Sequence, residues 1–186
     1  MTTGPVGRPR SESARHAVLR AVDDLLVEVG YAGVTMKGIA ERAGVGRQTV
    51  YRWWSTTAEI LLEACVDDAR EELATAPQPD AHREVHGYLR LLEAFLLHSH
   101  AGACYRVLLG ETQHDTRVRD LVARADILAP SARACLERVG AHLGRDRLTD
   151  DLHVAELVGP LVYSVLTTGR GPDLDALTTH LLTAWA

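Results

Sequence analysis

Hydrophobic residues recur at intervals of three and four over most of the chain, which is the spacing of one face of an amphipathic α-helix. The first such face runs from Ser13 to Val29 and stops before Gly30, a residue suited to the position after a helix C-terminus. No segment alternates convincingly between hydrophobic and polar residues at a period of two. The pattern therefore predicts an all-α fold. The hydrophobic positions of the first helix are Ala17, Val18, Ala21, Val22, Leu25, Leu26 and Val29.

Two short helices separated by a glycine follow this first helix. Thr35 is suited to cap the first of them, which extends to Ala43, and the second covers about residues 47–54. Gly44 stands in the turn, where the backbone needs a positive φ that glycine adopts without strain. Val45 is expected to fill the gap between the two helices. The arrangement is a helix-turn-helix in a three-helix module. Its small core is predicted to comprise Ile39, Ala40, Val50 and Trp54.

Longer helices are predicted beyond the polar linker Ser55-Thr56-Thr57, in which Thr56 or Thr57 can cap a helix over residues 58–76. Pro77-Gln78-Pro79 ends that helix, because proline lacks the N–H that would continue it. Further helices are expected at about 81–99, 103–111, 116–143, 150–168 and 172–186, with Pro130 bending or splitting the 116–143 helix and Pro172 near the start of the last. The core face of the 58–76 helix is Ile60, Leu61, Ala64, Cys65 and Leu73.

The net charge of −5 is unevenly distributed. Residues 1–56 carry eight basic and five acidic side chains, a net charge of +3, which leaves −8 for the remaining residues. A basic N-terminal third on an acidic body is expected when only that third contacts phosphate groups. The predicted domains are a flexible basic arm at 1–12, a helix-turn-helix DNA-binding domain at 13–56 and a larger C-terminal helical domain at 57–186.

The cysteine count and the hydrophobic runs indicate the compartment. Three cysteines at irregular spacing favour reduced thiols. No apolar run is long enough to span a membrane, and the first ten residues lack the apolar segment of a secretory signal. A cytoplasmic protein is therefore expected.

From residue 13 to about residue 65 the chain resembles the TetR family of bacterial transcriptional regulators. The matching segments keep the family's spacing throughout, which is more specific than a helix-turn-helix alone. The resemblance implies a homodimeric repressor that a small-molecule inducer releases from a palindromic operator. The matching segments are Gly30-Tyr31, Val34-Thr35, Ile39-Ala40, Ala43-Gly44-Val45, Thr49-Val50-Tyr51-Arg52-Trp53-Trp54 and Glu59-Ile60-Leu61.

The second short helix carries side chains suited to DNA: hydrogen-bond donors, an amide able to bind adenine through two hydrogen bonds, and aromatic rings. By the resemblance, Thr35 and Lys37 would contact phosphate, residues 47–49 would face base edges, and the aromatic residues would contact backbone or thymine methyl groups. Many relatives have lysine where this chain has Thr57, whose hydroxyl and helix N–H groups offer a weaker phosphate contact. The predicted DNA-binding residues are Thr35, Lys37, Arg47, Gln48, Thr49, Tyr51, Arg52, Trp53 and Thr57.

The segment Gly7-Arg8-Pro9-Arg10 has two interpretations. Its arginines could enter an A·T-rich minor groove, where a narrow groove concentrates negative potential. Alternatively, the segment is a solubilising tail. The residues alone leave both interpretations open.

The penultimate and last predicted helices look like the dimerisation end of TetR-family members. Gly159, within the segment Glu156–Tyr163, would let two helices approach closely. A dimer would also set two recognition helices about 34–36 Å apart, as two half-sites of an operator require. The leucines predicted to line the bundle between subunits are Leu157, Leu161, Leu174, Leu177, Leu181 and Leu182.

A small-molecule pocket is expected among the helices from residue 81 onward, with apolar walls and a few polar groups. The same residues can equally be ordinary core, and for any single residue that is the commoner case. Leu96 and Leu108 are further wall candidates. The predicted ligand-binding residues are Tyr88, Leu92, Phe95, Tyr105, Leu109 and Tyr163.

Metal, redox and enzymatic functions fit the sequence less well. His98 and His100 point about 200° apart on a helix, and His100 with Cys104 gives only two ligands on one face. His114 adds no third ligand on that face, and buried cysteines such as Cys65 behave mostly as small hydrophobes. No hydrolase, metalloprotease, P-loop or dinucleotide motif is present, so neither a cofactor nor catalysis is expected. The alternative left open is a helical DNA-binding protein without a ligand, acting as an adaptor or constitutive regulator.

Overall fold

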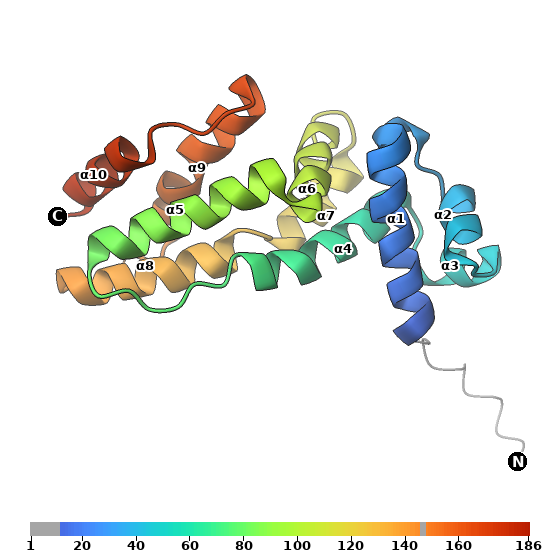
Figure 1. Ribbon diagram of the computed structural model, residues 1–186, viewed down its shortest axis with the longest axis horizontal. Coiled ribbons are helices and arrows are strands. Elements are labelled where there is room, and N and C mark those ends of the chain that lie inside the picture. The colour runs from blue at the N-terminus through green and yellow to red at the C-terminus, as the bar shows by residue number, and fades with distance from the viewer. Residues whose placement is uncertain (1–11, 146–147) are drawn as a thin grey trace, which may run out of the picture. The chain divides into compact units, whose positions relative to one another are not determined.

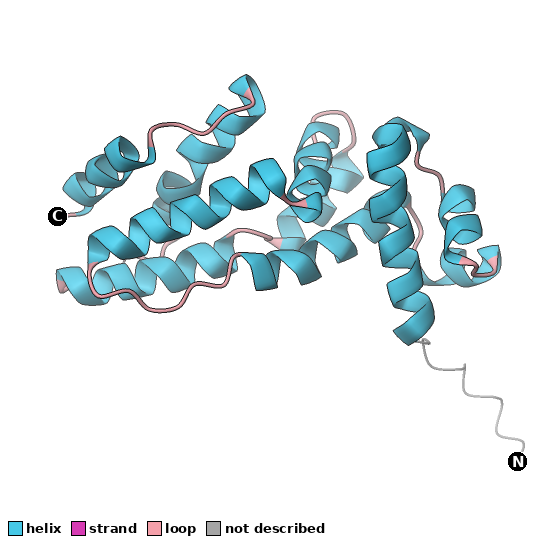
Figure 2. Cartoon of the chain, viewed as in Figure 1, coloured by secondary structure: helices cyan, strands magenta, loops and turns pink. Residues whose placement is uncertain are grey.

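The computed structural model describes residues 12–145 and 148–186, which form ten α-helices and contain no strand (Figures 1 and 2). This confirms the all-α prediction. The chain divides into two compact units, the first ending at Ala64 and the second running from Cys65 to Ala186. The segment Gly7-Arg8-Pro9-Arg10, interpreted either as a minor-groove arm or as a solubilising tail, lies outside the described residues.

The first unit consists of three helices and the start of a fourth. α1 packs against α2, and α2 packs against α3. Val18, Val22, Ile39, Val50 and Ile60 are each fully buried, so all four helices contribute to one core. Each such side chain stabilises the unit by about 1.5–3 kcal/mol relative to full exposure. The helix bounds are α1 Glu12–Gly33, α2 Met36–Ala43, α3 Arg47–Trp53 and α4 Thr57–Glu72.

Two glycines and one threonine set the turns of this unit as predicted. Gly30 has φ 67° and ψ 169°, which breaks the helical path of α1 three residues before its assigned end. Thr35 caps α2, and its Oγ1 accepts a hydrogen bond of 3.0 Å from the Gly38 N–H. Gly44 ends α2 at φ 66°, in the left-handed region that glycine adopts without strain. After this turn the chain continues into α3, the second helix of the helix-turn-helix.

The second unit is organised around α5, which contacts α6, α8, α9 and α10 (Figure 1). Its helices are α5 Ala81–His98, α6 His100–Glu111, α7 Thr116–Ala125, α8 Ala129–Leu143, α9 Asp151–Thr168 and α10 Leu174–Trp185. Apolar side chains from four of these helices meet around α5 and are at most 1% exposed. These side chains are Tyr88, Leu89, Leu92, Phe95, Leu96, Leu108, Leu136 and Leu157.

The predicted helix over residues 116–143 is two helices, α7 and α8, and the break lies at Asp126. Asp126 has φ 46°, which no α-helix tolerates. Its carboxylate is 3.2 Å from Nη1 of Arg133, so an ion pair from α8 accompanies the strained turn. Pro130 stands in the first turn of α8, where its missing N–H costs no intrahelical hydrogen bond.

Other helix ends also differ from the prediction, and α6 begins at His100 rather than near residue 103. α4 ends at Glu72 rather than near residue 76, and Arg138 on α8 donates from Nη2 to Thr75 Oγ1 at 2.5 Å. That tertiary contact binds the connecting segment in a non-helical path. α10 begins after Asp173, whose Oδ1 accepts from the N–H groups of Asp175 and Ala176 at 3.0 Å. Pro172 therefore precedes the N-cap instead of opening the helix.

Gly102 marks the closest approach of backbone in the second unit. A Cβ at this position of α6 would lie 1.8 Å from the carbonyl oxygen of Phe95 on α5. Real Cβ atoms do not approach a carbonyl so closely, so any other residue would force α6 away from α5. The short turn between these two helices therefore requires glycine.

We expect Gly102→Ala to lower the free energy of unfolding by about 1–3 kcal/mol, because backbone must shift to admit the methyl group. Urea unfolding followed by circular dichroism measures this change. The matched control is Gly110→Ala in the same helix, where an added Cβ meets nothing within 4 Å. The free energy of unfolding of that variant should rise by up to about 1 kcal/mol, because alanine has a higher helix propensity than glycine. Equal stability of the two variants would contradict the close-packing argument.

Candidate nucleic-acid interface

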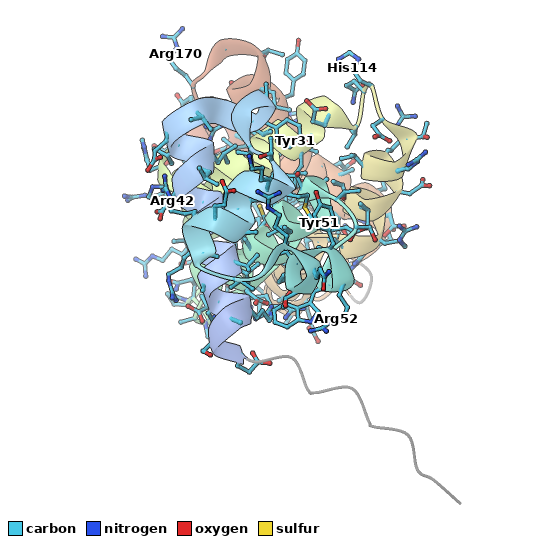
Figure 3. The ribbon with its side chains drawn as sticks, turned by 90° about the vertical axis from the view of Figure 1, so that its right-hand side faces the viewer. Tyr31, Arg42, Tyr51, Arg52, His114 and Arg170 are labelled. Atoms are coloured by element: carbon cyan, nitrogen blue, oxygen red, sulfur yellow. The ribbon has the colours of Figure 1, made fainter. Side chains whose placement is uncertain are left out.

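α3 has an inner face in the core of the first unit and an outer face in solvent. Val50 is fully buried and Trp54, the residue after α3, is 3% exposed, which fixes the inner face. Tyr51 is 56% exposed, and Figure 3 shows it with Arg52 on the outer side of this unit. Of the predicted DNA-binding residues on α3, Arg47, Gln48, Tyr51 and Arg52 are exposed, and Thr49 and Trp53 are half-buried.

The C-terminal end of α3 carries a group of stacked side chains. The rings of Trp53 and Trp54 meet edge to face, with centroids 5.5 Å apart and an interplanar angle of 76°. The guanidinium carbon of Arg52 lies 6.0 Å from the centroid of the Trp53 ring, within cation–π range. Arg52 and Trp53 therefore lie close together at the end of α3.

Glu63 of α4 is the main polar residue of this unit that the sequence analysis missed. Its Oε2 accepts a hydrogen bond of 2.7 Å from the indole N–H of Trp54. Its Oε1 is 2.5 Å from Nε of Arg15 on α1. One carboxylate therefore joins α1, the end of α3 and α4. The only sequence signal was an acidic residue beside the hydrophobic positions Ile60 and Ala64.

Glu41 of α2 holds two of the predicted DNA-binding cations. Its Oε1 lies 2.8 Å from Nη2 of Arg47 and 4.0 Å from Nζ of Lys37. All three side chains are more than half exposed, so each ion pair contributes little stability. Both cations can therefore exchange Glu41 for a phosphate or a base edge, but Glu41 opposes that exchange. The sequence analysis missed this competition.

The N-terminus of α4 is capped within the chain. Thr56 Oγ1 accepts from the Glu59 N–H at 3.2 Å, and the Glu59 carboxylate accepts from the Ser55 N–H at 2.6 Å. Thr56, and not Thr57, is thus the N-cap. Thr57 is half-buried in the first turn. Because Glu59 already places negative charge at this helix end, a phosphate near Thr57 is bound less favourably than a phosphate at a free helix N-terminus.

Arg42 fastens α2 to α1. Its Nη1 and Nη2 donate to the two carboxylate oxygens of Glu28 on α1 at 2.9 and 2.6 Å, which makes a bidentate pair. Asp24 lies further away, 3.9 Å from Nη1. The hydrogen bonds from Arg42 hold the pKa of Glu28 below its usual value. Arg42 is thus occupied by α1 and is not offered to DNA, although it is basic and lies beside the recognition helix in sequence.

The predicted ligand-binding residues are not brought together around one opening. Tyr88, Leu92 and Phe95 are at most 1% exposed, Tyr105 is 9% exposed, and Leu109 is half-buried. Burial raises the pKa of Tyr105 to about 12 and raises that of Tyr88 as well. Tyr163 is 71% exposed on α9. A side chain so open to solvent does not share a buried wall with Tyr88.

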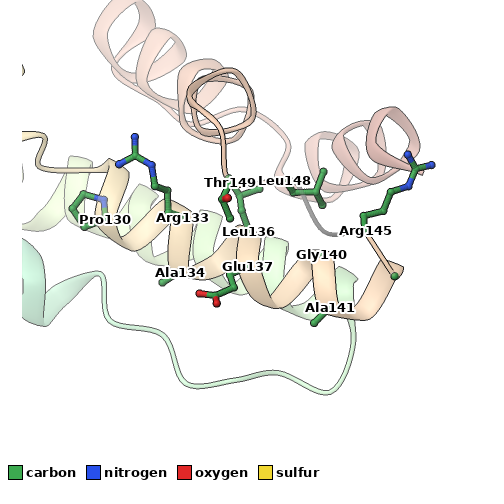
Figure 4. Close-up of a pocket in the computed structure, with 11 residues that line it drawn as sticks. Pro130, Arg133, Ala134, Leu136, Glu137, Gly140, Ala141, Arg145, Leu148 and Thr149 are labelled. Carbon is green, nitrogen blue, oxygen red and sulfur yellow. The ribbon is translucent and has the colours of Figure 1, made fainter.

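None of these six residues lines either of two hollows in the described part of the second unit. The larger, of about 810 Å³, is a groove along α8 bordered by Arg133, Glu137 and Arg145 (Figure 4). The smaller, of about 320 Å³, lies between the end of α4, the turn before α8 and α8 itself. Its walls include Leu73, Ile127 and Arg138. The sequence analysis missed both, because their lining residues show no distinctive pattern along the chain.

α9 exposes an apolar stripe that differs from the predicted dimer face. Leu152, Tyr163 and Leu166 are 65%, 71% and 48% exposed. Leu157 and Leu161, predicted to face a second subunit, are fully buried inside the protomer, as is Leu181 at 4%. These leucines belong to the other side of the same helix pair, which packs on α5.

Two further properties concern the described ranges only. In residues 12–145 and 148–186, no three His, Cys, Asp or Glu side chains are grouped so as to hold a metal ion. No helix in these ranges has the length and apolar character needed to cross a bilayer. All three cysteines are buried, and burial raises the pKa of Cys135 to about 12.

Residues 18–64 match the family described as "Bacterial regulatory proteins, tetR family". The HTH-type transcriptional regulator YdeS of Bacillus subtilis is 32% identical over 168 residues, which cover 88% of this chain and 83% of YdeS. The chain belongs to the TetR family. It is a DNA-binding transcriptional regulator with an N-terminal helix-turn-helix. The HTH-type transcriptional regulator AqdR of Rhodococcus erythropolis is 25% identical over 181 residues, covering 96% of this chain and 86% of AqdR.

Solved structures of TetR-family proteins share the fold of both units. The TetR family transcription regulator SCO0332 has a TM-score of 0.67 at 27% identity, covering 93% of this chain and 96% of that one. The multidrug binding protein EbrR, complexed with imidazole, has a TM-score of 0.65 at 20% identity, covering 97% and 96%. The resemblance that the sequence shows over residues 13–65 thus continues through the helical second unit.

We expect Glu41→Gln to raise affinity for DNA about two- to tenfold at low salt, because Arg47 and Lys37 lose an intramolecular competitor and a repulsive charge is removed. Fluorescence anisotropy with random-sequence duplexes measures the change. The control, Glu71→Gln, removes the same charge at an exposed site of the second unit. If Glu71→Gln raises the affinity for DNA as much as Glu41→Gln does, the gain comes from net charge alone and the proposed competition by Glu41 is wrong.

Proposed function

We propose that this TetR-family regulator is a repressor that binds a palindromic operator as a homodimer and leaves it when a small molecule binds the second unit. The DNA-binding part of this proposal is supported by the two different faces of α3, one buried and one exposed. Val50 and Trp54 anchor its inner face, while Gln48, Tyr51 and Arg52 face solvent. An exposed row of donors and an aromatic ring on an anchored short helix is what entry into a major groove requires.

The side chains divide into contacts that position the protein and contacts that read sequence. Thr35 and Lys37 at the start of α2, with Thr57 at the start of α4, bind phosphates, because their donors lie at helix starts and carry no base specificity. Residues 47–49 open α3 and read base edges. The amide of Gln48 matches adenine and the guanidinium of Arg47 matches guanine. Tyr51, Arg52 and Trp53 contact backbone or thymine methyl groups.

Dimerisation uses the outer face of α9. Leu152, Gly159, Tyr163 and Leu166 follow one another at intervals of seven, four and three, so they share one side of the helix. Gly159 presents no side chain, and a Cβ there would meet nothing within 4 Å, which leaves room for a second helix. Three large apolar residues exposed on one helix support a partner surface, since monomers rarely leave such a stripe open. A second copy of the chain supplies the partner.

Coupling between ligand and DNA runs through α4. The helix is continuous from Thr57 to Glu72, with Ile60 and Leu61 buried near its start and Ala69 buried near its end. A ligand that moves the end of α4 changes the spacing of the two recognition helices in the dimer. A coupling free energy of about 1–3 kcal/mol corresponds to roughly a 5–150-fold loss of DNA affinity. The 320 Å³ cavity beside α4 favours this mechanism over a regulator without a ligand.

We expect Arg47→Ala to weaken the free energy of operator binding by about 1–3 kcal/mol and to relax the base preference. Tyr51→Ala should weaken binding to all DNA sequences alike. Anisotropy titrations against the promoter region of its own gene, repeated over salt concentration, separate the two effects. Arg124→Ala, at an exposed position of α7, is the control. If both variants bind like that control, α3 is not the recognition helix. If the parent protein shows no preference over random duplexes, the proposed operator is wrong.

We expect Tyr163→Glu and Leu166→Glu to convert the dimer to monomers, because each places a charge in an apolar contact between subunits. Sedimentation equilibrium gives the mass directly. Ala123→Glu, an exposed position on α7, should leave the dimer intact. The dimer surface lies elsewhere if all three variants sediment as dimers. Loss of the dimer should also abolish tight operator binding, since a single recognition helix contacts too few bases.

A further inference from the structure

The smaller cavity of the second unit combines an apolar body with a cationic end. Hydrophobic side chains form most of its wall, including Val66 and Leu73 from α4, Ile127 from the turn, and Ala134 from α8. Two arginines and one aspartate also line it, so the charged lining has a net charge of +1. Its volume of about 320 Å³ suits a small organic molecule. The polar lining residues are Arg70, Thr75, Asp126, Ser131 and Arg138.

Arg138 is fixed in place but retains unused donors. Its Nε donates to Glu84 at 2.9 Å and its Nη2 to Thr75 at 2.5 Å. Glu84 is only 1% exposed and also accepts from the Gln78 N–H at 2.6 Å, so the guanidinium is held by a buried, fully engaged carboxylate. Among the described residues, Nη1 of Arg138 has no hydrogen-bond partner, and Nη2 uses one of its two N–H groups. A planar fork with free N–H groups therefore borders the cavity.

Several side-chain acceptors of the lining are already engaged. One oxygen of Asp126 pairs with Arg133 at 3.2 Å. Ser131 donates to the carbonyl oxygen of Leu128 at 2.9 Å, and its Oγ then accepts from the hydroxyl of Tyr88 at 3.1 Å. Thr75 accepts from Arg138, which leaves its hydroxyl hydrogen free to donate. The cavity thus offers more donors than acceptors at its polar end.

We propose that this cavity binds a small monocarboxylic acid with a hydrocarbon body, whose carboxylate pairs with the free N–H groups of Arg138. The proposal rests on the ligand-responsive function proposed above and names the class of its effector. A carboxylate accepts two parallel hydrogen bonds from a guanidinium, which a neutral amide or a cation cannot do. The hydrocarbon part lies against Val66, Leu73 and Ile127.

The same contact explains how the acid would act on α4. Arg138 binds Thr75, three residues beyond the end of α4, and Arg70 of α4 lines the cavity directly. A carboxylate on the free N–H groups of Arg138 adds a negative charge beside the end of α4 and draws Arg70 toward the cavity. The end of α4 therefore shifts when the cavity fills.

The first test is direct binding to the full-length protein by isothermal titration calorimetry. The probes are straight-chain acids from butanoate to decanoate, each compared with the primary amide of the same length. At least one acid should bind with a Kd below one millimolar and at least tenfold more tightly than its amide. Equal binding of acids and amides, or no binding of any acid at millimolar concentration, would overturn the proposal. Neither result depends on DNA, so the proposed operator binding is tested separately.

Variants locate the site. Glu84→Gln with Arg138→Gln replaces the buried ion pair by two amides, so no lone charge is left buried, and acid affinity should fall at least tenfold. Ala134→Phe, at an exposed position on the cavity wall, fills the cavity without disturbing the core. It should weaken the binding of the acids and of the amides alike. Arg90→Gln removes an exposed charge of α5 outside the cavity, and this variant should bind the acids with a Kd within twofold of that of the parent protein. Acid binding unchanged in both cavity variants would place the ligand elsewhere and refute the assignment.

Discussion

The carboxylate of Glu63 is the interaction on which the geometry of the DNA-binding unit depends. The indole N–H of Trp54 is buried, and Glu63 is its acceptor at 2.7 Å, while the other oxygen pairs with Arg15 at 2.5 Å. A buried donor without an acceptor would cost about 1–3 kcal/mol. Trp54 follows α3 directly, so this hydrogen bond fixes the end of the recognition helix against α4. The outward direction of Tyr51 and Arg52 follows from that anchor.

Charge is used in opposite ways on the two sides of this unit. The pair of Arg42 with Glu28 is bidentate and joins two helices, so that arginine is structural. The pair of Arg47 with Glu41 is a single exposed contact that DNA can replace. The two arginines are five residues apart and chemically identical. Their roles differ because only Arg42 faces the acidic side of α1, where Glu28 and Asp24 lie one turn apart.

The second unit places a similar polar anchor inside a larger apolar core. Glu84 is almost fully buried, and its charge is balanced by Arg138 and by the N–H of Gln78. Removing either member of the pair alone would leave an uncompensated charge, which is far more costly than removing both. The pair ties the segment between α4 and α5 to α8. It also places one arginine between the buried core and the cavity, which makes a structural residue available to a ligand.

The local features of the fold could be predicted from the sequence because they depend on neighbours along the chain. Thr35 as a cap, Gly44 in the turn, and the buried positions Ile39, Ala40, Val50 and Trp54 all follow from spacing and from backbone preference. Apolar periodicity identifies which face of a helix is buried but not what buries it. Leu157 and Leu161 were therefore assigned to a second subunit although α5 covers them, and Tyr163 was assigned to a pocket although it faces solvent. The Glu63 anchor and the cavity beside Arg138 were decided only by the tertiary structure, because each joins residues from helices far apart in the sequence.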